Sequence, residues 1–246
     1  MPDSKDHALW RISKFNRLRG TIAAASHHGL QRQTLISSTL QAELRVLDRR
    51  REAADPLEVV AACVRLRESA LIYLQCEDLV WPVTLFPAQM LYHSPRSLAL
   101  ATQHEMSALK IIEIEPAGVR PPGHWMEERV ASVESYHALM RALWVLALQG
   151  PRTSLLYEIA GTAAYRVLRS PTGQGLATPG ALGPAVERLH NDSAPLRTIA
   201  GWPGMSLERA SRLLNALYLT SNLIVSRTHH SARSGTLQWL LSRRGR

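Results

Sequence analysis

Two neighbouring segments near the carboxyl end carry the clearest hydrophobic pattern in the chain. Apolar residues recur at helical spacing within residues 195–200, and again along one face of a longer run over residues 207–217. Trp202-Pro203-Gly204 separates the two runs, because proline removes a hydrogen-bond donor and glycine permits a positive φ. Residues 223–227 begin with an apolar, β-branched stretch, which favours a strand. The pattern therefore predicts a short helix, a turn, a longer helix and a strand.

The amino-terminal half alternates between helical and strand periodicity. The predicted elements are residues 34–51 (helix), 55–66 (helix), 70–76 (strand), 80–92 (strand), 97–107 (helix) and 109–115 (strand). Pro82 and Pro87 are expected at strand edges or bends, because proline cannot donate to a β-ladder. These residues predict a small mixed α/β unit.

The middle of the chain is predicted to be helical. Residues 117–123 are rich in proline and glycine, which indicates a linker, and Trp125 is expected to pack against other residues. Apolar spacing then predicts one helix ending near Gly150 and a second helix over residues 154–168. Residues 170–180 contain three glycines and two prolines and indicate a loop.

The helix-turn-helix-strand order at the carboxyl end resembles the winged-helix superfamily. Residues 228–235 form a polar, glycine-containing loop of the length that a wing needs, and residues 236–241 would return as its second strand. The resemblance covers roughly residues 182–241. It implies that the second helix, residues 207–217, enters the major groove of double-stranded DNA. It also implies a homodimer, since winged-helix regulators are usually two-fold dimers.

Together these patterns predict an α+β protein that is predominantly helical. It would have a small N-terminal mixed α/β unit, a helical middle and a C-terminal winged helix. The predicted segments are a basic N-terminal arm (1–30), a small α+β unit (31–116), a linker (117–123), a helical segment (124–180) and a winged-helix module with a basic tail (181–246).

The formal net charge of +9 is concentrated at the two ends of the chain. Residues 1–30 carry five basic and two acidic side chains, and residues 31–190 carry sixteen of each. Residues 191–246 carry eight arginines against two acidic residues. A basic segment attached to a neutral body is typical of a protein that binds a polyanion. The alternative is a general enrichment in arginine, as in GC-rich bacteria, which implies no partner.

The basic arm has a loosely amphipathic pattern around Trp10, Lys14 and Arg17. Such an arm either reaches a membrane surface or a nucleic-acid backbone, or it docks on its own domain. No apolar run in the chain approaches the roughly 18–20 residues that span a bilayer. Cys63 and Cys76 are too few for a disulfide framework and favour buried free thiols in a reducing cytoplasm.

The sequence contains no motif of a common enzyme class. A phosphate-binding glycine loop, a dinucleotide-binding motif, a zinc-protease motif, paired CxxC motifs and a nucleophile elbow are all missing. His93, His104 and Glu105 are not accompanied by a nucleophile, base and orienting group at motif spacing. The adjacent His229 and His230 lack a Cys or acidic partner for a metal. We therefore expect a non-enzymatic protein without a cofactor or metal.

The residues that would read DNA follow from the predicted second helix. Arg209, Arg212 and Asn215 are spaced to project from its outer face. Arginine can bond guanine in a bidentate manner, and asparagine can do the same with adenine. Supporting contacts are expected from Arg197, Ser206, Arg227, His229 and Arg233.

Two functions remain open from the sequence. The first is a cytoplasmic bacterial transcription regulator that binds double-stranded DNA through the winged helix. The second is a signalling or assembly adaptor whose winged helix docks protein instead, through an apolar patch of Trp202, Met205, Tyr218 and Trp239. In that case the N-terminal unit could also bind the protein partner. The concentration of positive charge in the C-terminal module favours DNA.

Overall fold

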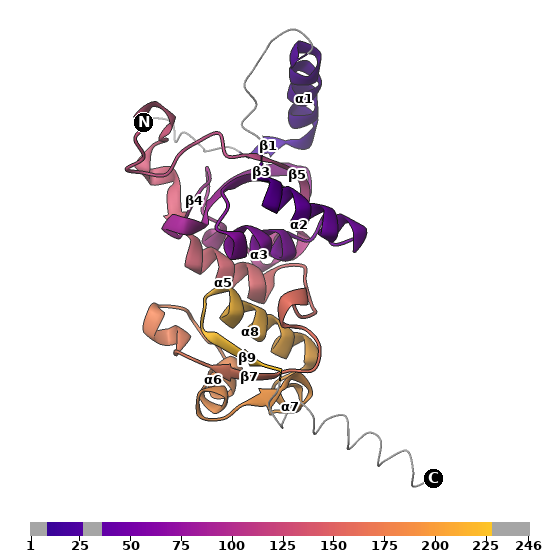
Figure 1. Cartoon of the computed structure of the whole chain (residues 1–246), viewed down its shortest axis with the longest axis vertical. Coiled ribbons are helices and arrows are strands. Elements are labelled where there is room, and N and C mark those ends of the chain that lie inside the picture. Colours follow the sequence, from indigo (N-terminus) through magenta and orange to yellow (C-terminus); the bar gives the residue numbers. More distant parts are fainter. Residues whose placement is uncertain (1–8, 27–35, 228–246) are drawn as a thin grey trace. The chain divides into compact units, whose positions relative to one another are not determined.

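The computed structural model describes residues 9–26 and 36–227, and the chain forms two compact units, residues 1–142 and 143–246 (Figure 1). In the described residues each unit has its own antiparallel sheet. The predicted linker, residues 117–123, lies inside unit 1, and the boundary between the units falls within a helix, α5 (Leu139–Gln149).

Unit 1 is built on a sheet whose central hairpin is formed by β2 and β3. The strands follow the order β5-β2-β3-β4-β6, and β1 pairs with the start of β3. The elements are β1 (Trp10–Arg11), α1 (Ile12–Ser26), α2 (Ser38–Arg49), α3 (Pro56–Leu66), β2 (Ala70–Cys76), β3 (Leu79–Phe86), β4 (Leu91–His93), α4 (Gln103–Ala108), β5 (Lys110–Pro116) and β6 (Tyr136–Ala138). A two-residue turn at Glu77-Asp78 joins β2 to β3, with Glu77 in the left-handed region at a φ of 52°.

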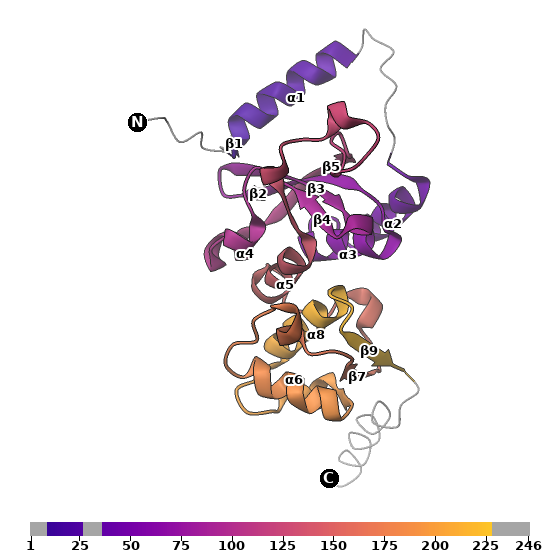
Figure 2. The same cartoon turned by 90° about the vertical axis from the view of Figure 1, so that its left-hand side faces the viewer.

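Helices lie on both sides of this sheet. α1 lies on one side, and α2 and α3 lie on the other (Figures 1 and 2). Residues 56–63 of α3 are all buried, and Asp55 caps the helix by accepting a hydrogen bond from the Leu57 amide. Ile72 and Trp81 are each 1% exposed and point to the side away from α1. The main core of unit 1 therefore lies between the sheet and α3.

The first turns of α1 dock on the sheet through an aromatic cluster. Phe15 is 5% exposed and packs against Tyr73 and Val80. The ring centroids of Phe15 and Tyr73 are 4.9 Å apart. Arg19 forms ion pairs with Glu113 and Glu115 of β5. Of the alternatives for the basic arm, docking on its own domain is the one that the structure shows for residues 9–19.

Unit 2 has α8 at its centre. Its elements are the remainder of α5, β7 (Ala164–Val167), α6 (Leu182–Asn191), β8 (Ala194–Pro195), α7 (Leu196–Ala200), α8 (Leu207–Leu219) and β9 (Leu223–Ser226). The predicted helix, turn, helix and strand are confirmed by α7, α8 and β9. The sheet order is β8-β7-β9, so β9 pairs with a strand that precedes the three helices. The predicted returning strand, residues 236–241, lies outside the described residues.

The prediction of a predominantly helical protein is wrong. The structure is 47% helix and 21% strand, with an antiparallel sheet of six strands in unit 1, and is an α+β fold. The predicted helix over residues 154–168 is replaced by a 3-10 turn at Tyr157–Ile159 and by β7. Gly161, at a φ of 95°, interrupts the run, and β7 pairs with strands on both sides. Non-local pairing thus overrides the local apolar spacing.

Residues 124–138, also predicted to be helical, contain two 3-10 turns and β6. In the part of the chain that the structure describes, no helix is both long enough and apolar enough to cross a bilayer. Cys63 and Cys76 are buried and free, as predicted. Burial raises the pKa of the Cys63 thiol to about 12, so this residue carries no thiolate at neutral pH.

Replacing Phe15 with Ser should undock the start of α1 while leaving the sheet folded. Loss of one buried aromatic side chain weakens the docked state by about 2 kcal/mol, and amides of residues 12–19 should exchange roughly 30-fold faster with deuterium. Leu18→Ser, on the same helix but 44% exposed, is the control and should change exchange little. Equal effects of the two variants would show that Phe15 does not hold the helix.

Candidate functional site

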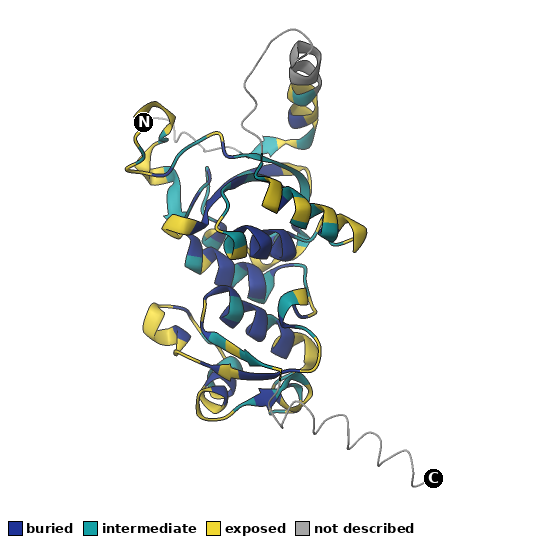
Figure 3. Ribbon diagram, viewed as in Figure 1, coloured by how far each residue is buried: buried dark blue, intermediate teal, exposed yellow. Residues whose placement is uncertain are grey.

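The predicted DNA-reading helix, α8, is a core element of unit 2. Eight of its residues are buried, from Ala210 to Leu219, and Figure 3 colours most of the helix as buried. The exposed residues are confined to the first turn, where Leu207 is 58% exposed and Glu208 and Arg209 reach the surface. Beyond its first turn, the helix therefore has no exposed outer face.

Asn215 was predicted to project outward, and the structure places it in the core with 0% exposure. Its Oδ1 accepts a hydrogen bond of 2.9 Å from the Leu156 amide, and its Nδ2 donates one of 2.9 Å to the Ser154 carbonyl. The side chain therefore satisfies backbone groups of the segment that follows α5. Because the side chain is fully buried, its amide does not reach the surface to contact an adenine.

Arg212 was also predicted to face DNA, and it instead caps the end of α5. Its Nη1 donates hydrogen bonds of 2.8 Å to the carbonyls of Leu148 and Gly150, and its Nε donates one of 2.9 Å to Glu208. The last carbonyls of a helix have no intrahelical partner and carry partial negative charge, which a guanidinium offsets. The side chain is 14% exposed, so the predicted outward placement is wrong.

The other predicted DNA contacts are dispersed along unit 2. Arg197 and Arg209 are exposed, and Ser206 is the N-cap of α8, where its Oγ accepts from the Arg209 amide at 3.1 Å. Arg209 also donates to the Gly204 carbonyl at 2.7 Å. Arg227 donates to the carbonyls of residues 158 and 160. His229 and Arg233 lie outside the described residues.

The apolar patch predicted for protein docking is not an open surface either. Trp202, Met205 and Tyr218 are all half-buried. The Arg188 guanidinium stacks over the Trp202 ring, 5.5 Å from its centroid. Trp239 lies outside the described residues. The three described members of the predicted patch are therefore only partly exposed.

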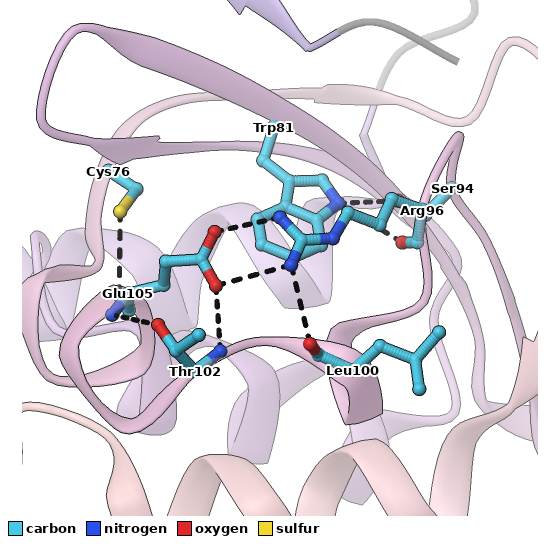
Figure 4. Close-up of polar contacts among 7 residues, drawn as sticks. All are labelled: Cys76, Trp81, Ser94, Arg96, Leu100, Thr102 and Glu105. Carbon is cyan, nitrogen blue, oxygen red and sulfur yellow. Dashed lines mark hydrogen bonds and ion pairs between the residues drawn. The ribbon is translucent and has the colours of Figure 1, made fainter. Parts of the chain in front are cut away.

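The most connected polar cluster of unit 1 surrounds Glu105 and Arg96 (Figure 4). Arg96 donates two hydrogen bonds to the Glu105 carboxylate, at 2.7 and 3.3 Å, and its guanidinium lies 5.1 Å from the Trp81 ring centroid. Glu105 also accepts from the Thr102 amide at 2.7 Å in a capping box at the start of α4. The Trp81 indole donates to Ser94 Oγ at 2.8 Å.

The members of this network form hydrogen bonds and ion pairs mainly with one another. The Arg96 guanidinium, followed by the Thr102 amide, lowers the pKa of Glu105 to about 2. His104 lies apart from the network and contacts the exposed Glu77 at 2.8 Å. His93 is half-buried, and burial followed by the nearby His137 lowers its pKa. The cluster joins β3 and the segment that follows β4 to α4, and Glu105 is held as the partner of Arg96.

Outside these clusters, the most exposed aromatic side chain among the described residues is Trp125. Trp125 was expected to pack against other residues, and it is 80% exposed. It lies in the segment between β5 and β6, together with Val133, which is 74% exposed. We call residues 118–134 the Trp125 loop; much of it is exposed. Its residue types alone do not reveal that the aromatic ring faces solvent.

The Trp125 loop is held by specific hydrogen bonds. The Arg120 amide donates to the Arg129 carbonyl at 2.9 Å, which closes the loop. The Tyr136 hydroxyl donates to the Arg120 carbonyl and accepts from the Ala131 amide at 3.0 Å. Next to Trp125, the Met126 amide donates to His124 Nδ1 at 3.1 Å. The exposed ring is therefore presented from a structured backbone.

The charge of the loop is negative, unlike that of the chain as a whole. Glu127, Glu128 and Glu134 are exposed, and Arg129 is the exposed basic residue among them. Acidic groups beside an apolar anchor would repel nucleic-acid phosphates and anionic lipid headgroups. With three glutamates against Arg120 and Arg129, the loop combines exposed apolar side chains with a small net negative charge.

Comparison with known proteins returned no match: no family model, no curated protein and no solved structure is significantly similar to the chain. Among the described residues, no group of three or more His, Cys, Asp or Glu side chains is arranged to hold a metal ion. The functional argument therefore depends on the geometry of the chain's own residues.

Asn215→Ala should destabilise the protein by about 2–3 kcal/mol, because it removes two hydrogen bonds and leaves the buried Leu156 amide without an acceptor. Arg209→Ala is the control and should change the unfolding free energy by less than about 0.5 kcal/mol. Urea unfolding measures both values. An Asn215 variant as stable as the control would contradict the core role of this side chain.

The Glu105 ion pair should make stability depend on acid pH. Its pKa of about 2 in the folded protein is below the ordinary value of 4.5, so its contribution is complete above about pH 5 and is lost as the pH falls toward 2. The stability difference between the native protein and Glu105→Gln should therefore shrink over this range. Glu77→Gln, at the exposed His104 contact, should show a small difference throughout.

Proposed function

We propose that this chain is a non-enzymatic adaptor that binds a protein partner through the Trp125 loop. The observation that carries the proposal is the 80% exposure of Trp125 on a loop closed by backbone hydrogen bonds and the Tyr136 hydroxyl. A tryptophan exposed to this degree loses the hydrophobic stabilisation that burial would provide. Contact with a partner would recover it.

Aromatic anchors dominate the energetics of many protein interfaces. Tryptophan is enriched among the residues whose truncation weakens binding most, and one such side chain can bury about 150–250 Å². A loop already held in one conformation loses less entropy on binding than a mobile one. The hydrogen bonds of the Tyr136 hydroxyl to Arg120 and Ala131 would therefore increase affinity by holding the loop in one conformation.

DNA binding through α8 is the weaker proposal. The arginine and the asparagine best suited to base recognition, Arg212 and Asn215, are engaged with backbone groups of unit 2. The exposed first turn of α8 combines Arg209 with Glu208 and the apolar Leu207. A carboxylate beside the only exposed arginine of this helix opposes contact with phosphates.

A photo-crosslinking amino acid in place of Trp125 should capture a discrete protein from lysate of the source cells. The same amino acid in place of Leu100, which is 73% exposed in the same unit, is the matched control and should not. Capture at position 125 should fall when Tyr136→Phe removes the hydroxyl that orders the loop. No capture at position 125, or equal capture at both positions, would contradict the adaptor proposal.

The competing proposal is tested by the affinity for mixed-sequence duplex DNA at several salt concentrations. A DNA reader weakens by about 0.9 log units per phosphate contact for each log unit of salt. We expect no sequence preference, and no effect of Arg209→Ala on any residual binding. Sequence-dependent binding that Arg209→Ala abolishes would favour the regulator instead.

A further inference from the structure

Unit 2 carries a second exposed apolar surface, on the outer face of its sheet. Arg166 of β7 lies directly opposite Ile224 of β9 in the antiparallel register, so both side chains share one face. The pairing continues beyond β7, where the Leu168 amide donates to the Asn222 carbonyl at 2.8 Å. Leu168 is two residues from Arg166 and so lies on the same side. Ile224 is 44% exposed and Leu168 is 50% exposed.

This surface, which we call the β7–β9 face, is basic. Arg166 is exposed, and among the described residues it makes a long hydrogen bond of 3.5 Å from Nε to the His190 carbonyl. Neither β7 nor β9 contains an acidic residue. The face therefore combines two apolar side chains with one arginine.

The β7–β9 face and the Trp125 loop are complementary in charge and similar in apolar character. The loop presents Trp125 and Val133 beside three exposed glutamates and Arg129, and the face presents Ile224 and Leu168 beside Arg166. Each surface is exposed on its own unit. Pairing of two loops would instead bring like charges together, which is unfavourable.

We propose that the Trp125 loop of one copy of this chain docks on the β7–β9 face of a second copy. The proposal rests on the proposed function, in which the loop is a protein-binding site, and names the partner as the chain itself. The Trp125 ring would cover Ile224 and Leu168. The loop glutamates would lie near Arg166 of the other copy.

Such an interface is heterologous, because two different surfaces meet. One aromatic anchor and a few surface ion pairs form a small contact, below the roughly 1,200–2,000 Å² of stable complexes. Exposed ion pairs contribute little individually, and salt screens them. The association should therefore be weak and reversible, and it should decrease as salt increases.

Sedimentation velocity of the full chain at several protein and salt concentrations tests this proposal. At low salt the mean mass should rise with concentration, and salt should reverse the rise. Trp125→Ser and Ile224→Ser should each shift self-association to at least 10-fold higher concentration. Leu100→Ser and Leu207→Ser, at comparably exposed apolar positions, are the controls and should associate like the native chain.

Mixing the two interface variants gives the sharpest result. Trp125→Ser retains an intact β7–β9 face, and Ile224→Ser retains an intact loop, so an equimolar mixture should form a one-to-one dimer that neither variant forms alone. A charge exchange should have the same outcome. Glu127→Arg with Glu128→Arg in one protein, and Arg166→Glu in another, should each weaken association, and mixing the two proteins should restore it. Thermal unfolding of each variant establishes that it is folded.

A chain that stays monomeric at every concentration and salt, or variants that do not complement each other, would overturn the self-association proposal. Association that survives Trp125→Ser would also overturn it. The adaptor proposal has a separate readout, since photo-crosslinking at position 125 identifies the captured protein. Capture of a different protein by a monomeric chain would leave the adaptor function standing and refute self-association.

Discussion

The burial of α8 depends on satisfying the backbone groups around it. The end of α5 and the segment that follows it carry carbonyl and amide groups that lie against α8 and need partners within the protein. Arg212 and Asn215 supply those partners from the helix itself. Side chains used in this way cannot also face a ligand. The residues that a surface helix would present to DNA thus hold the core of unit 2 together.

The polar residues of unit 1 follow the same rule. The Glu105 carboxylate accepts hydrogen bonds from Arg96 and from the Thr102 amide at the start of α4, and the Trp81 indole donates to Ser94. Arg19 is likewise engaged with the carboxylates of β5. Charged residues of both units therefore serve the fold, and their number alone does not identify a polyanionic partner.

Two exposed surfaces in the described part of the chain combine apolar side chains with charged neighbours. The Trp125 loop is acidic in a basic chain, and the β7–β9 face is basic without a balancing carboxylate on either strand. The net charge of +9 does not reveal that these two surfaces differ in the sign of their charge. A distribution of this kind favours contacts between unlike surfaces over symmetric pairing, and it makes electrostatics a determinant of specificity.

Features that depend on local interactions could be read from the sequence. The Asp55 cap and the following proline begin α3, and Ser206 caps α8 before a run of apolar residues. The strand β2 could be predicted from its apolar, β-rich composition and from the turn that follows it. These elements were predicted because caps, turns and periodicity act within a few residues.

Tertiary contacts decided the rest. An apolar stripe predicts that a helix has one buried face, but it does not reveal that non-local partners at residues 148–156 also cover the polar positions of α8. β7 is a strand because β8 and β9, distant in sequence, pair with it. Trp125 is exposed on a loop that the Tyr136 hydroxyl and the Arg120 backbone close through contacts distant from it in sequence. Local sequence thus determined where most elements lie, whereas the packing of distant segments determined which side chains remain available for binding.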